Sequence, residues 1–345
     1  MKILRLALLA GLAAVPAIGA GTAAAQQIEL KVSHHVPPKH TIQKEFERWG
    51  AELAQKSGGR IKLSIFPAGQ MGPPPRQLDL VRTGVADVAM ILAGLLPGRT
   101  PLTEAMALPF VFNKEGSPTP LNAAQASPIV TGMAGALEKE YPGSKILYIV
   151  ASPAGSLFFS KAVVRMPADL KGLRVRHNGP IPLATLKAWG ATPASVAPAE
   201  VTDALSKGVI DGAIFNYEGG QAFQLGESVH AVTELNFAAG LFVILMNRAK
   251  YDSLPPDLRK LIDDTTGIEA AKRVGAAWDK AEATGREYFL AKKAQIVVPD
   301  AAQHKAFRDA AKPVIDQTLA DLEAKGVPAK AFFAALAKQV QAAKP

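Results

Sequence analysis

Apolar and polar residues alternate in short segments along the first third of the chain, and segments with a helical spacing of apolar positions lie between them. Alternation with a period of two predicts strands at residues 28–35 and 60–67, and residues 85–92 (VADVAMIL) are predicted as a third strand. Apolar side chains at helical spacing predict helices at residues 41–59, which end in a Gly-Gly stop, and 76–84. This β-α-β-α-β order predicts a mainly parallel sheet with helices on its faces.

The same two patterns continue with new material to the end of the chain, without a strict internal repeat. Further strands are predicted at residues 145–164, 172–177, 191–198, 211–216 and 234–248. Further helices are predicted at residues 121–140, 182–190 and 199–210, and over most of the chain from 256 onward, broken by an apolar run at 295–299. The fold class is therefore α/β with two lobes, each a mainly parallel sheet flanked by helices, joined by lobe-crossing strands and long helices.

The N-terminal segment has the three parts of a secretory signal peptide. Lys2 and Arg5 precede an apolar run, and Ala23-Ala24-Ala25 precede the expected cleavage site. The run is short and broken by glycine, alanine and proline, although an uncleaved anchor is the alternative reading. Residues 1–25 are thus a predicted signal peptide, and about 320 residues remain, which is more than one hydrophobic core usually serves.

The chain has no cysteine, so neither disulfides nor a lipid-modified cysteine are available, and we expect a freely diffusing periplasmic protein.

The chain is basic, with a formal net charge of +9 that falls to about +7 when Lys2 and Arg5 are removed. The basic residues are scattered among acidic ones, and no basic run with interleaved aromatic residues occurs. Nucleic acid is therefore not an expected partner. A general attraction for small anions is the more useful inference from the charge.

One short predicted strand carries two arginines to its end. In residues 172–177 (GLRVRH), Arg174 and Arg176 point to one face and the apolar residues to the other. Asn178-Gly179-Pro180 then turns directly into a helix, so Arg176 lies at the carboxyl end of a strand, where α/β sheets place their ligands. A guanidinium is a permanent charge whose planar fork matches a carboxylate. Surface charges or ion pairs between lobes are the alternative, and alternation alone does not choose between the two arginines.

An ordered set of motifs around this strand resembles one transporter family. The motifs are Asp169-Leu170-Lys171-Gly172, Arg176, Gly190-Ala191-Thr192-Pro193, Glu200-Val201, Ala204-Leu205, Gly208 and Asp211-Gly212. Upstream GGRIKLSIFPAGQMG and downstream LMNRAKYDSLPPDLRKLI extend the match over nearly the whole mature chain. Together they resemble the substrate-binding proteins of tripartite ATP-independent periplasmic (TRAP) transporters, of the C4-dicarboxylate-binding (DctP) type.

The resemblance implies a two-lobed periplasmic binding protein that closes around an organic carboxylate and delivers it to the membrane subunits of an ion-gradient-driven importer. In such relatives, the arginine at the position of Arg176 forms a salt bridge with the substrate carboxylate. We expect residues 26–152 plus about 240–282 to form the first lobe. Residues 153–239 plus about 283–345 are expected to form the second lobe and the C-terminal helices. No cofactor is implied, and we expect a monomer.

Two departures from the family pattern bear on the ligand. Many relatives have a second arginine in the strand that precedes the Asp-Leu-Lys-Gly segment, whereas residues 156–161 (SLFFSK) contain none. Many also have asparagine three residues after the Asp-Gly pair, where this chain has Phe215 followed by Asn216. The site has therefore lost a charge and gained aromatic surface, with Phe158, Tyr217 and Phe242 as further candidates that a hydrophobic core would equally accommodate. We expect a monocarboxylate with an apolar or aromatic body.

Other candidate contacts come from the ends of predicted strands. His34 and His35 end the first strand, and a role between the lobes or at the surface is their alternative. Their spacing with His40 does not fit a compact metal site, and no matching Asp, Glu or Cys set follows, so no metal is expected. Gly94 follows the third strand and would allow the backbone to approach the ligand closely. Asn178 and Glu218 also lie near strand ends.

Three other functions remain as alternatives. An enzyme is disfavoured because the chain contains no G-x-S-x-G, H-E-x-x-H, Walker or G-x-G-x-x-G motif. A binding protein of an ATP-driven importer shares the two-lobed architecture, although the motif order argues against it. A receptor that presents its ligand to a sensor kinase stays open.

Overall fold

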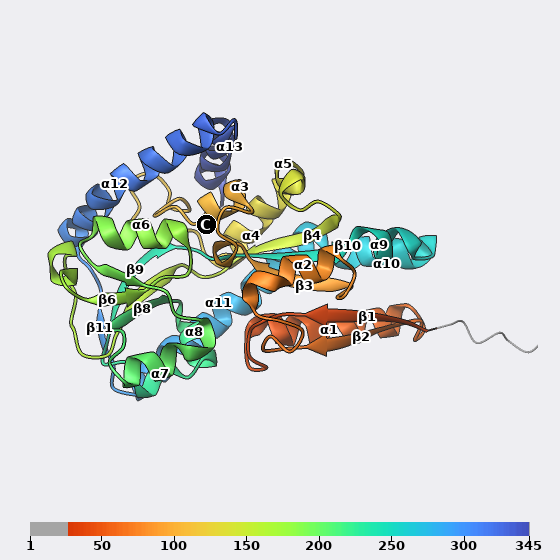
Figure 1. The fold of residues 1–345 in the computed structure, drawn as a ribbon, viewed down its shortest axis with the longest axis horizontal. Coiled ribbons are helices and arrows are strands. Elements are labelled where there is room, and N and C mark those ends of the chain that lie inside the picture. Colours follow the sequence, from red (N-terminus) through yellow and green to blue (C-terminus); the bar gives the residue numbers. More distant parts are fainter. Residues whose placement is uncertain (1–26, 345) are drawn as a thin grey trace, which may run out of the picture.

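The computed structural model describes residues 27–344, and these residues form two lobes that are each built on one sheet (Figure 1). The predicted signal peptide lies outside the described residues. The sheet of the first lobe has the strand order β2-β1-β3-β10-β4. Its strands are β1 (Ile28–Ser33), β2 (Ile61–Phe66), β3 (Val88–Leu92), β4 (Ser144–Ala151) and β10 (Leu241–Asn247).

The sheet of the second lobe has the strand order β11-β9-β5-β8-β6-β7. Its strands are β5 (Gly155–Phe159), β6 (Arg174–Arg176), β7 (Thr192–Ala194), β8 (Gly212–Phe215), β9 (Ala231–Ala238) and β11 (Gln295–Val297). Each sheet contains one reversed strand, because β10 is antiparallel to β3 and β4, and β5 is antiparallel to β8 and β9. Both sheets are therefore mixed but mainly parallel, which confirms the predicted α/β class.

Two neighbouring segments carry the chain from one lobe to the other, where β4 leads into β5 and β9 leads into β10. The two segments are hydrogen-bonded to each other: the Ser152 N–H donates to the Gly240 carbonyl, and the Gly240 N–H donates to Ser152 Oγ, both at 2.9 Å. Short paired crossings of this kind allow the lobes to rotate about them while each sheet stays intact.

Helices cover both sheets. The first lobe carries α1 (Thr41–Lys56), α2 (Gln77–Arg82), α3 (Pro101–Ala105), α4 (Ala123–Gly132), α5 (Ala134–Leu137), α9 (Arg248–Ser253) and α10 (Pro256–Thr265). The second lobe carries α6 (Pro180–Ala188), α7 (Val201–Ser206) and α8 (Tyr217–Ala222). The single helix predicted at residues 121–140 is instead split into α4, α5 and a 3-10 turn, in a segment that contains Gly132 and Gly135, two poor helix formers. The glycines of α8 (YEGGQA) explain why that helix left no clear signal in the sequence.

Continuous apolar strands have both faces buried. In β10, Val243 and Leu245 belong to the core on one side of the first sheet, whereas Ile244 and Met246 belong to the core on the other side. A strand covered on both faces lacks polar alternation, which is why residues 241–246 read as an unbroken apolar run.

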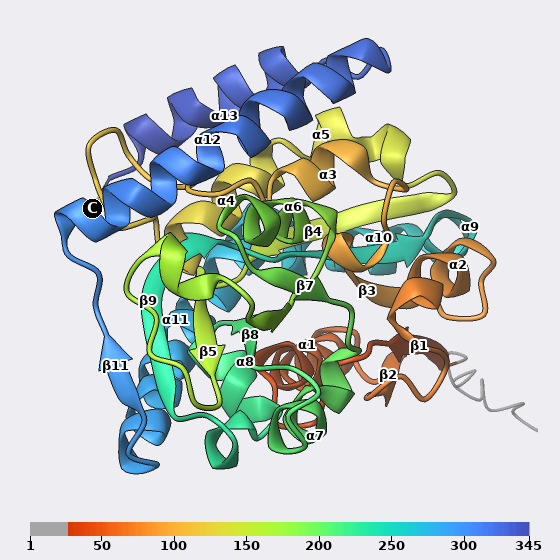
Figure 2. The ribbon, with the colours of Figure 1, turned by 60° about the vertical axis from the view of Figure 1, so that its left-hand side comes forward.

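Three long helices complete the fold: α11 (Gly267–Ala291), α12 (Ala301–Ala324) and α13 (Ala329–Ala342). Figures 1 and 2 show α12 and α13 side by side along one edge of the molecule. Phe307 of α12 packs in the core of the second lobe, whereas Phe332 and Leu336 of α13 pack in a core of the first lobe. The residue boundaries of the two lobes that the sequence predicts stay a prediction. Among the described residues, no helix is long and apolar enough to cross a membrane.

Helix α11 contacts both lobes through two carboxylates one turn apart. Asp279 accepts hydrogen bonds from the first two backbone N–H groups of α4, at 2.8 and 2.9 Å. Glu282 accepts hydrogen bonds from the first two backbone N–H groups of α8, at 2.7 and 2.8 Å. A carboxylate satisfies free N–H groups at a helix start and interacts favourably with the helix dipole. One helix thus fixes the starts of two others, one in each lobe.

Two glycines allow these contacts. A Cβ atom on Gly275 would lie 2.4 Å from the Ala123 carbonyl oxygen, at the start of α4. A Cβ atom on Gly285 would lie 2.6 Å from the Tyr217 carbonyl carbon, at the start of α8. Any side chain at either position would therefore push α11 away from one lobe.

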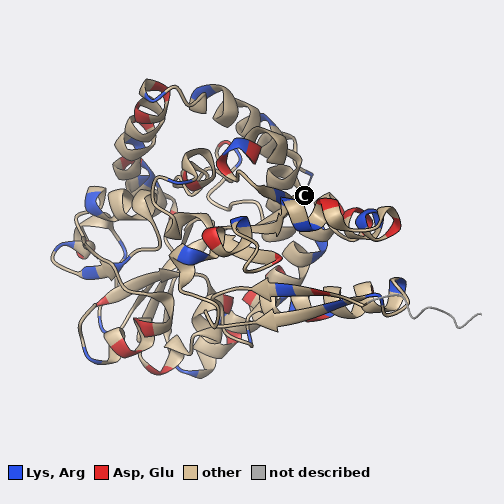
Figure 3. Cartoon of the chain, turned by 45° about the vertical axis from the view of Figure 1, so that its right-hand side comes forward, with Lys and Arg blue, Asp and Glu red and all other residues tan. Residues whose placement is uncertain are grey.

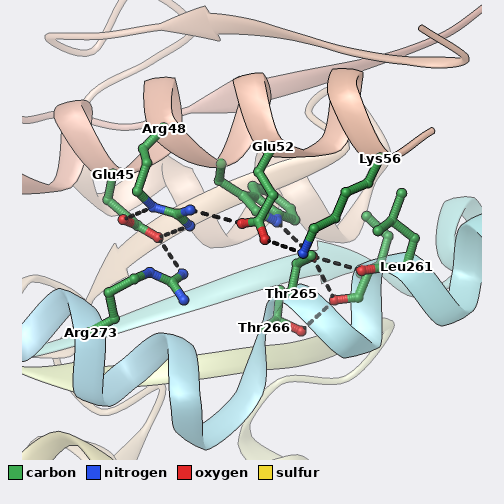
Figure 4. Close-up of polar contacts among 10 residues, drawn as sticks. Glu45, Arg48, Glu52, Lys56, Leu261, Thr265, Thr266 and Arg273 are labelled. Atoms are coloured by element: carbon green, nitrogen blue, oxygen red, sulfur yellow. Dashed lines mark hydrogen bonds and ion pairs between the residues drawn. The ribbon is translucent and has the colours of Figure 1, made fainter. Parts of the chain in front are cut away.

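Ion pairs and hydrogen bonds hold α1 against α10 and α11 (Figure 4). Glu45 is buried and accepts hydrogen bonds from Arg48, at 2.8 Å, and from Arg273 of α11, at 2.9 Å. Trp49 donates from its indole N–H to Thr265 Oγ1 of α10 at 3.0 Å. These contacts fix the position of α1, and with it the start of that helix, which faces the second lobe.

Charged residues of both signs are interspersed over the two lobes (Figure 3). Many ion pairs join neighbouring turns of one helix, as in Lys260–Asp264 and Lys312–Asp316. The positive net charge is therefore spread over the surface.

Candidate functional site

A cavity lies between the two lobes. The first lobe and the crossing segments contribute His35, Val36, His40, Leu92, Ser152, Pro153, Gly240 and Phe242 to its wall. The second lobe contributes Gly155, Arg176, Asn178, Pro198, Ile214, Phe215, Asn216, Gly219, Phe223 and Ala238. Six of the residues expected to contact a ligand are thereby brought together: His35, Arg176, Asn178, Phe215, Asn216 and Phe242.

Arg176 is a buried positive charge without an acidic partner among residues 27–344. Its side chain lies at the carboxyl end of β6, and the residue is only 3% exposed. Its guanidinium donates to two backbone carbonyls, that of Val196 at 3.2 Å and that of Ile214 at 3.3 Å. Burial lowers the pKa of Arg176 to about 10, so the group stays protonated at neutral pH. The Phe215 ring lies 5.0 Å from the guanidinium, in cation–π contact.

Arg174, on the same face of the same strand, is placed differently. Its guanidinium is exposed and donates to both carboxylate oxygens of Asp211, at 2.8 and 3.0 Å. The pair raises the pKa of Arg174 and lowers the pKa of Asp211. Arg174 therefore has its own anion at the surface, and only Arg176 lines the cavity.

The rest of the cavity wall is largely apolar and aromatic. Phe215 and Phe223 lie side by side with ring centroids 5.8 Å apart, and Phe242 reaches the cavity from the first lobe. Phe223 was not among the residues expected from the sequence. It directly follows α8, a helix without a clear sequence signal, so no pattern indicated that its ring would reach this wall.

Two polar side chains on the wall each have a buried atom without a hydrogen-bond partner within residues 27–344. His35 is 8% exposed, and its Nδ1 atom is buried without a partner. Burial, followed by the charges of His40, His34 and Arg176, lowers the pKa of His35 to about 3, so its ring is neutral. Oδ1 of Asn178 is also buried without a partner.

The other expected contact residues do not line the cavity. Phe158 is fully buried in the core of the second lobe, where its ring packs edge-on against Tyr217 and Phe289. Tyr217 donates from its hydroxyl to Glu234 at 2.8 Å, away from the cavity. His34 is fully buried and stacks on Phe46. In each case helices packed behind the sheet enclose a side chain whose position near a strand end suggested a ligand contact.

Gly94 forms a contact between the lobes. A Cβ atom at this position would lie 2.3 Å from the Asn178 carbonyl oxygen, and one on Gly179 would lie 2.8 Å from the Gly94 carbonyl oxygen. The close backbone approach expected at Gly94 is therefore made to the second lobe. The lobes touch here because neither backbone carries a side chain.

Glu218 joins the lobes at a second point. Its carboxylate accepts hydrogen bonds from the Thr41 backbone N–H at 2.7 Å and from Thr41 Oγ1 at 2.9 Å, at the start of α1. The other carboxylate oxygen lies 3.4 Å from His40 Nε2. His40 Nδ1 accepts from the Ile42 N–H, so the ring proton is on Nε2 and faces Glu218. Burial lowers the pKa of His40, opposed by the charge of Glu218.

Replacing Glu218 by alanine is expected to weaken ligand binding at least tenfold. Charge-assisted hydrogen bonds each contribute roughly 1.5–3 kcal/mol, and these are made only when the lobes are together. Isothermal titration calorimetry measures the change. Glu227→Ala is the control, because Glu227 lies in the same lobe but pairs with the exposed Lys292. Equal affinities of Glu218→Ala and wild type would show that this contact does not contribute to closure.

The buried ring of His34 is expected to make the stability of the folded protein depend on pH. Burial lowers its pKa from 6.5 to about 4, so the folded protein holds the ring neutral where the unfolded chain binds a proton. Its stabilisation is therefore complete above pH 6.5 and is lost as the pH falls toward 4. Between pH 7 and 5, His34→Phe should lose roughly 1–2 kcal/mol less stability than wild type, measured by urea unfolding at both pH values. Equal losses in the two proteins would contradict this account.

Within residues 27–344, no group of three or more His, Asp or Glu side chains is arranged to hold a metal ion. His34 and His40 are engaged with Gln43 and Glu218, respectively. The site thus offers one fixed cation, neutral polar groups and an aromatic wall.

Comparisons with known proteins agree with this geometry. The family model of bacterial extracellular solute-binding protein, family 7 (DctP), matches residues 32–321. The 2,3-diketo-L-gulonate-binding periplasmic protein YiaO of Escherichia coli (strain K12) is 26% identical over 295 residues, which cover 84% of this chain and 85% of that protein.

Two solved structures are similar over nearly their whole length. A marine metagenome TRAP solute-binding protein specific for aromatic acid ligands, in complex with metahydroxyphenylacetate, has a TM-score of 0.87 at 28% identity and covers 92% of this chain and 100% of its own. A TRAP solute-binding protein from Rhodoferax ferrireducens T118, in complex with copurified benzoate, has a TM-score of 0.85 at 27% identity and covers 91% of this chain and 98% of its own.

Proposed function

Since the chain belongs to family 7 of the bacterial extracellular solute-binding proteins, the DctP family, we propose that it captures an aromatic monocarboxylate in the periplasm and delivers it to the membrane subunits of a TRAP transporter. The family is one of binding proteins, and the mechanism proposed here breaks no covalent bond.

The unpaired charge of Arg176 carries this proposal. A buried guanidinium without an anion is unfavourable, and a carboxylate in the cavity would relieve that cost with charge-assisted hydrogen bonds. Such a contact contributes roughly 1.5–3 kcal/mol. Micromolar binding needs about 8 kcal/mol, so burial of the ligand body and closure of the lobes must supply the rest.

The aromatic wall supports a ligand with an aromatic body. Phe215, Phe223 and Phe242 present rings to the cavity, and a planar ligand ring would bury apolar surface against them. The cavity wall contains no second arginine or lysine to pair with a second carboxylate. Both observations favour a monocarboxylate over a small dicarboxylate, and the two structural relatives described above hold aromatic acids.

The mechanism follows from the position of the cavity between the lobes. The open lobes sample closure, and a ligand that contacts both lobes shifts the population toward the closed form. In that form Gly94 meets Asn178, and Glu218 meets the start of α1. The closed complex would then dock on the membrane subunits, where an ion gradient supplies the energy for uptake.

A thermal-shift screen of the mature chain against carboxylates tests the proposal. The protein is first unfolded and refolded, which removes any ligand carried over from the cells. Aliphatic, aromatic, 2-oxo and dicarboxylic acids are compared. A ligand at one hundred times its dissociation constant stabilises the folded protein by about 2.7 kcal/mol. Stabilisation by aromatic monocarboxylates is the expected result, whereas tight binding of succinate-like diacids alone would refute the aromatic assignment.

A further inference from the structure

The cavity contains two hydrogen-bond acceptors that no group of the described chain satisfies. The neutral ring of His35 has one nitrogen with a proton and one with a lone pair, and its buried Nδ1 atom makes no hydrogen bond within residues 27–344, so Nδ1 is an open acceptor when the proton is on Nε2. The amide oxygen of Asn178 is the second acceptor. His35 comes from the first lobe and Asn178 from the second, so the two side chains line the space between the lobes in which a ligand would be held.

Each of the two side chains carries one hydrogen-bond acceptor in either assignment of its atoms. Exchanging the oxygen and nitrogen of the Asn178 amide leaves one acceptor, and either tautomer of His35 leaves one lone pair. Other polar groups on the wall are already engaged. Ser152 Oγ donates to the Pro153 carbonyl, and the Asn216 amide donates to Glu282 at 2.8 Å. The nearby cation, Arg176, already donates to two carbonyls of its own lobe.

A carboxylate does not satisfy these acceptors. An ionised carboxylate only accepts hydrogen bonds, so it matches Arg176 but supplies no proton to His35 or Asn178. A buried acceptor without a donor is unfavourable, and a ligand that leaves it so binds less tightly than one that satisfies it. The full ligand must therefore bring a hydrogen-bond donor in addition to its carboxylate.

We infer that the site selects aromatic acids that carry a hydroxyl group in addition to the carboxylate, and that Asn178 and His35 recognise the hydroxyl. A hydroxyl donates one hydrogen bond and accepts others, so it can donate to one of these side chains and accept from the N–H of the other. The inference rests on the proposed function, because it presupposes that Arg176 holds the carboxylate.

Pairs of ligands that differ only in the donor test the inference. The refolded mature chain is titrated by calorimetry with 3- and 4-hydroxybenzoate and with 3- and 4-fluorobenzoate, in which fluorine takes the place of the hydroxyl without a proton to donate. Mandelate and phenylacetate form a further pair, with the hydroxyl next to the carboxylate. One satisfied hydrogen bond should tighten binding about tenfold in at least one pair. A preference below about threefold in every pair would overturn the inference.

Variants then identify the residues responsible. In Asn178→Leu and His35→Leu, the ratio of the two dissociation constants of the preferred pair should fall toward one in at least one of the two proteins. His230→Leu is the matched control, because His230 is exposed and outside the cavity, and it should keep the wild-type ratio. A hydroxyl preference that both cavity variants retain would overturn the assignment to these residues.

The two proposals fail in different ways. If no aromatic acid binds at all, the proposed function is wrong. If fluorinated and hydroxylated acids bind equally well, the aromatic carboxylate site stands and only the hydroxyl selection is wrong.

Discussion

Replacing Arg176 by methionine is expected to raise the dissociation constant for the carboxylate ligand by roughly two orders of magnitude or more. Loss of one partner of a buried, hydrogen-bonded charge pair typically costs about 2–5 kcal/mol. Methionine keeps much of the length and apolar character of the side chain, so the walls formed by Phe215 and Ile214 should stay in place. Calorimetry on the refolded protein measures the affinity.

Arg174→Met is the matched control, because Arg174 lies on the same strand and the same face but pairs with Asp211 at the surface. Its affinity should equal that of the wild type. The ligand-free Arg176→Met protein should be about as stable as the wild type, because the substitution removes an unpaired buried charge. Loss of binding in Arg174→Met with retention in Arg176→Met would refute the assignment of the anchor.

Replacing Gly94 by alanine is expected to weaken ligand binding at least tenfold by holding the lobes apart. The new Cβ atom would lie 2.3 Å from the Asn178 carbonyl oxygen, a distance that no relaxed structure tolerates. The contact involves backbone on one side, so no flexible side chain can move away. The ligand would then bind a form that is incompletely closed, and its apparent affinity would fall because the fully closed form is less populated.

Small-angle scattering with saturating ligand provides the second measurement, since the alanine variant should keep a larger radius of gyration than the wild type. Gly135→Ala is the control, because nothing lies within 4 Å of the added Cβ atom. It should bind and close as the wild type does. Unchanged affinity and full closure of Gly94→Ala would show that this contact is absent from the ligand-bound form.

Local sequence patterns were sufficient for much of the fold. Alternation located β1 and β2, and helical spacing located α1 and α2, because each of these elements is partly exposed and must present different residues to core and solvent. The start of α4 and the existence of α8 depended on contacts with α11, which no local pattern reveals.

Charge and alternation by themselves left the expected anchor open between Arg174 and Arg176, and the family resemblance indicated Arg176. Both arginines lie on one face of β6 because side chains alternate. The tertiary structure separates them physically: Asp211, which directly precedes β8, pairs with Arg174, while β8, the Val196 backbone and the first lobe enclose Arg176. Charge and alternation are properties of the strand, whereas burial and pairing depend on residues far away in the chain.

The same distinction applies to the aromatic residues. The sequence offered both Phe158 and Phe215 as candidate ligand contacts, and both lie in strands of the second sheet, but they have different environments. Both rings lie on the same side of the sheet, where Phe289 of α11 covers Phe158, whereas Phe215 at the end of β8 reaches the cavity beside Arg176. The sequence thus determined which elements form and which side chains share a face. The packing of helices and lobes decided which parts of a shared face became core and which became the site, because burial is a property of two surfaces in contact.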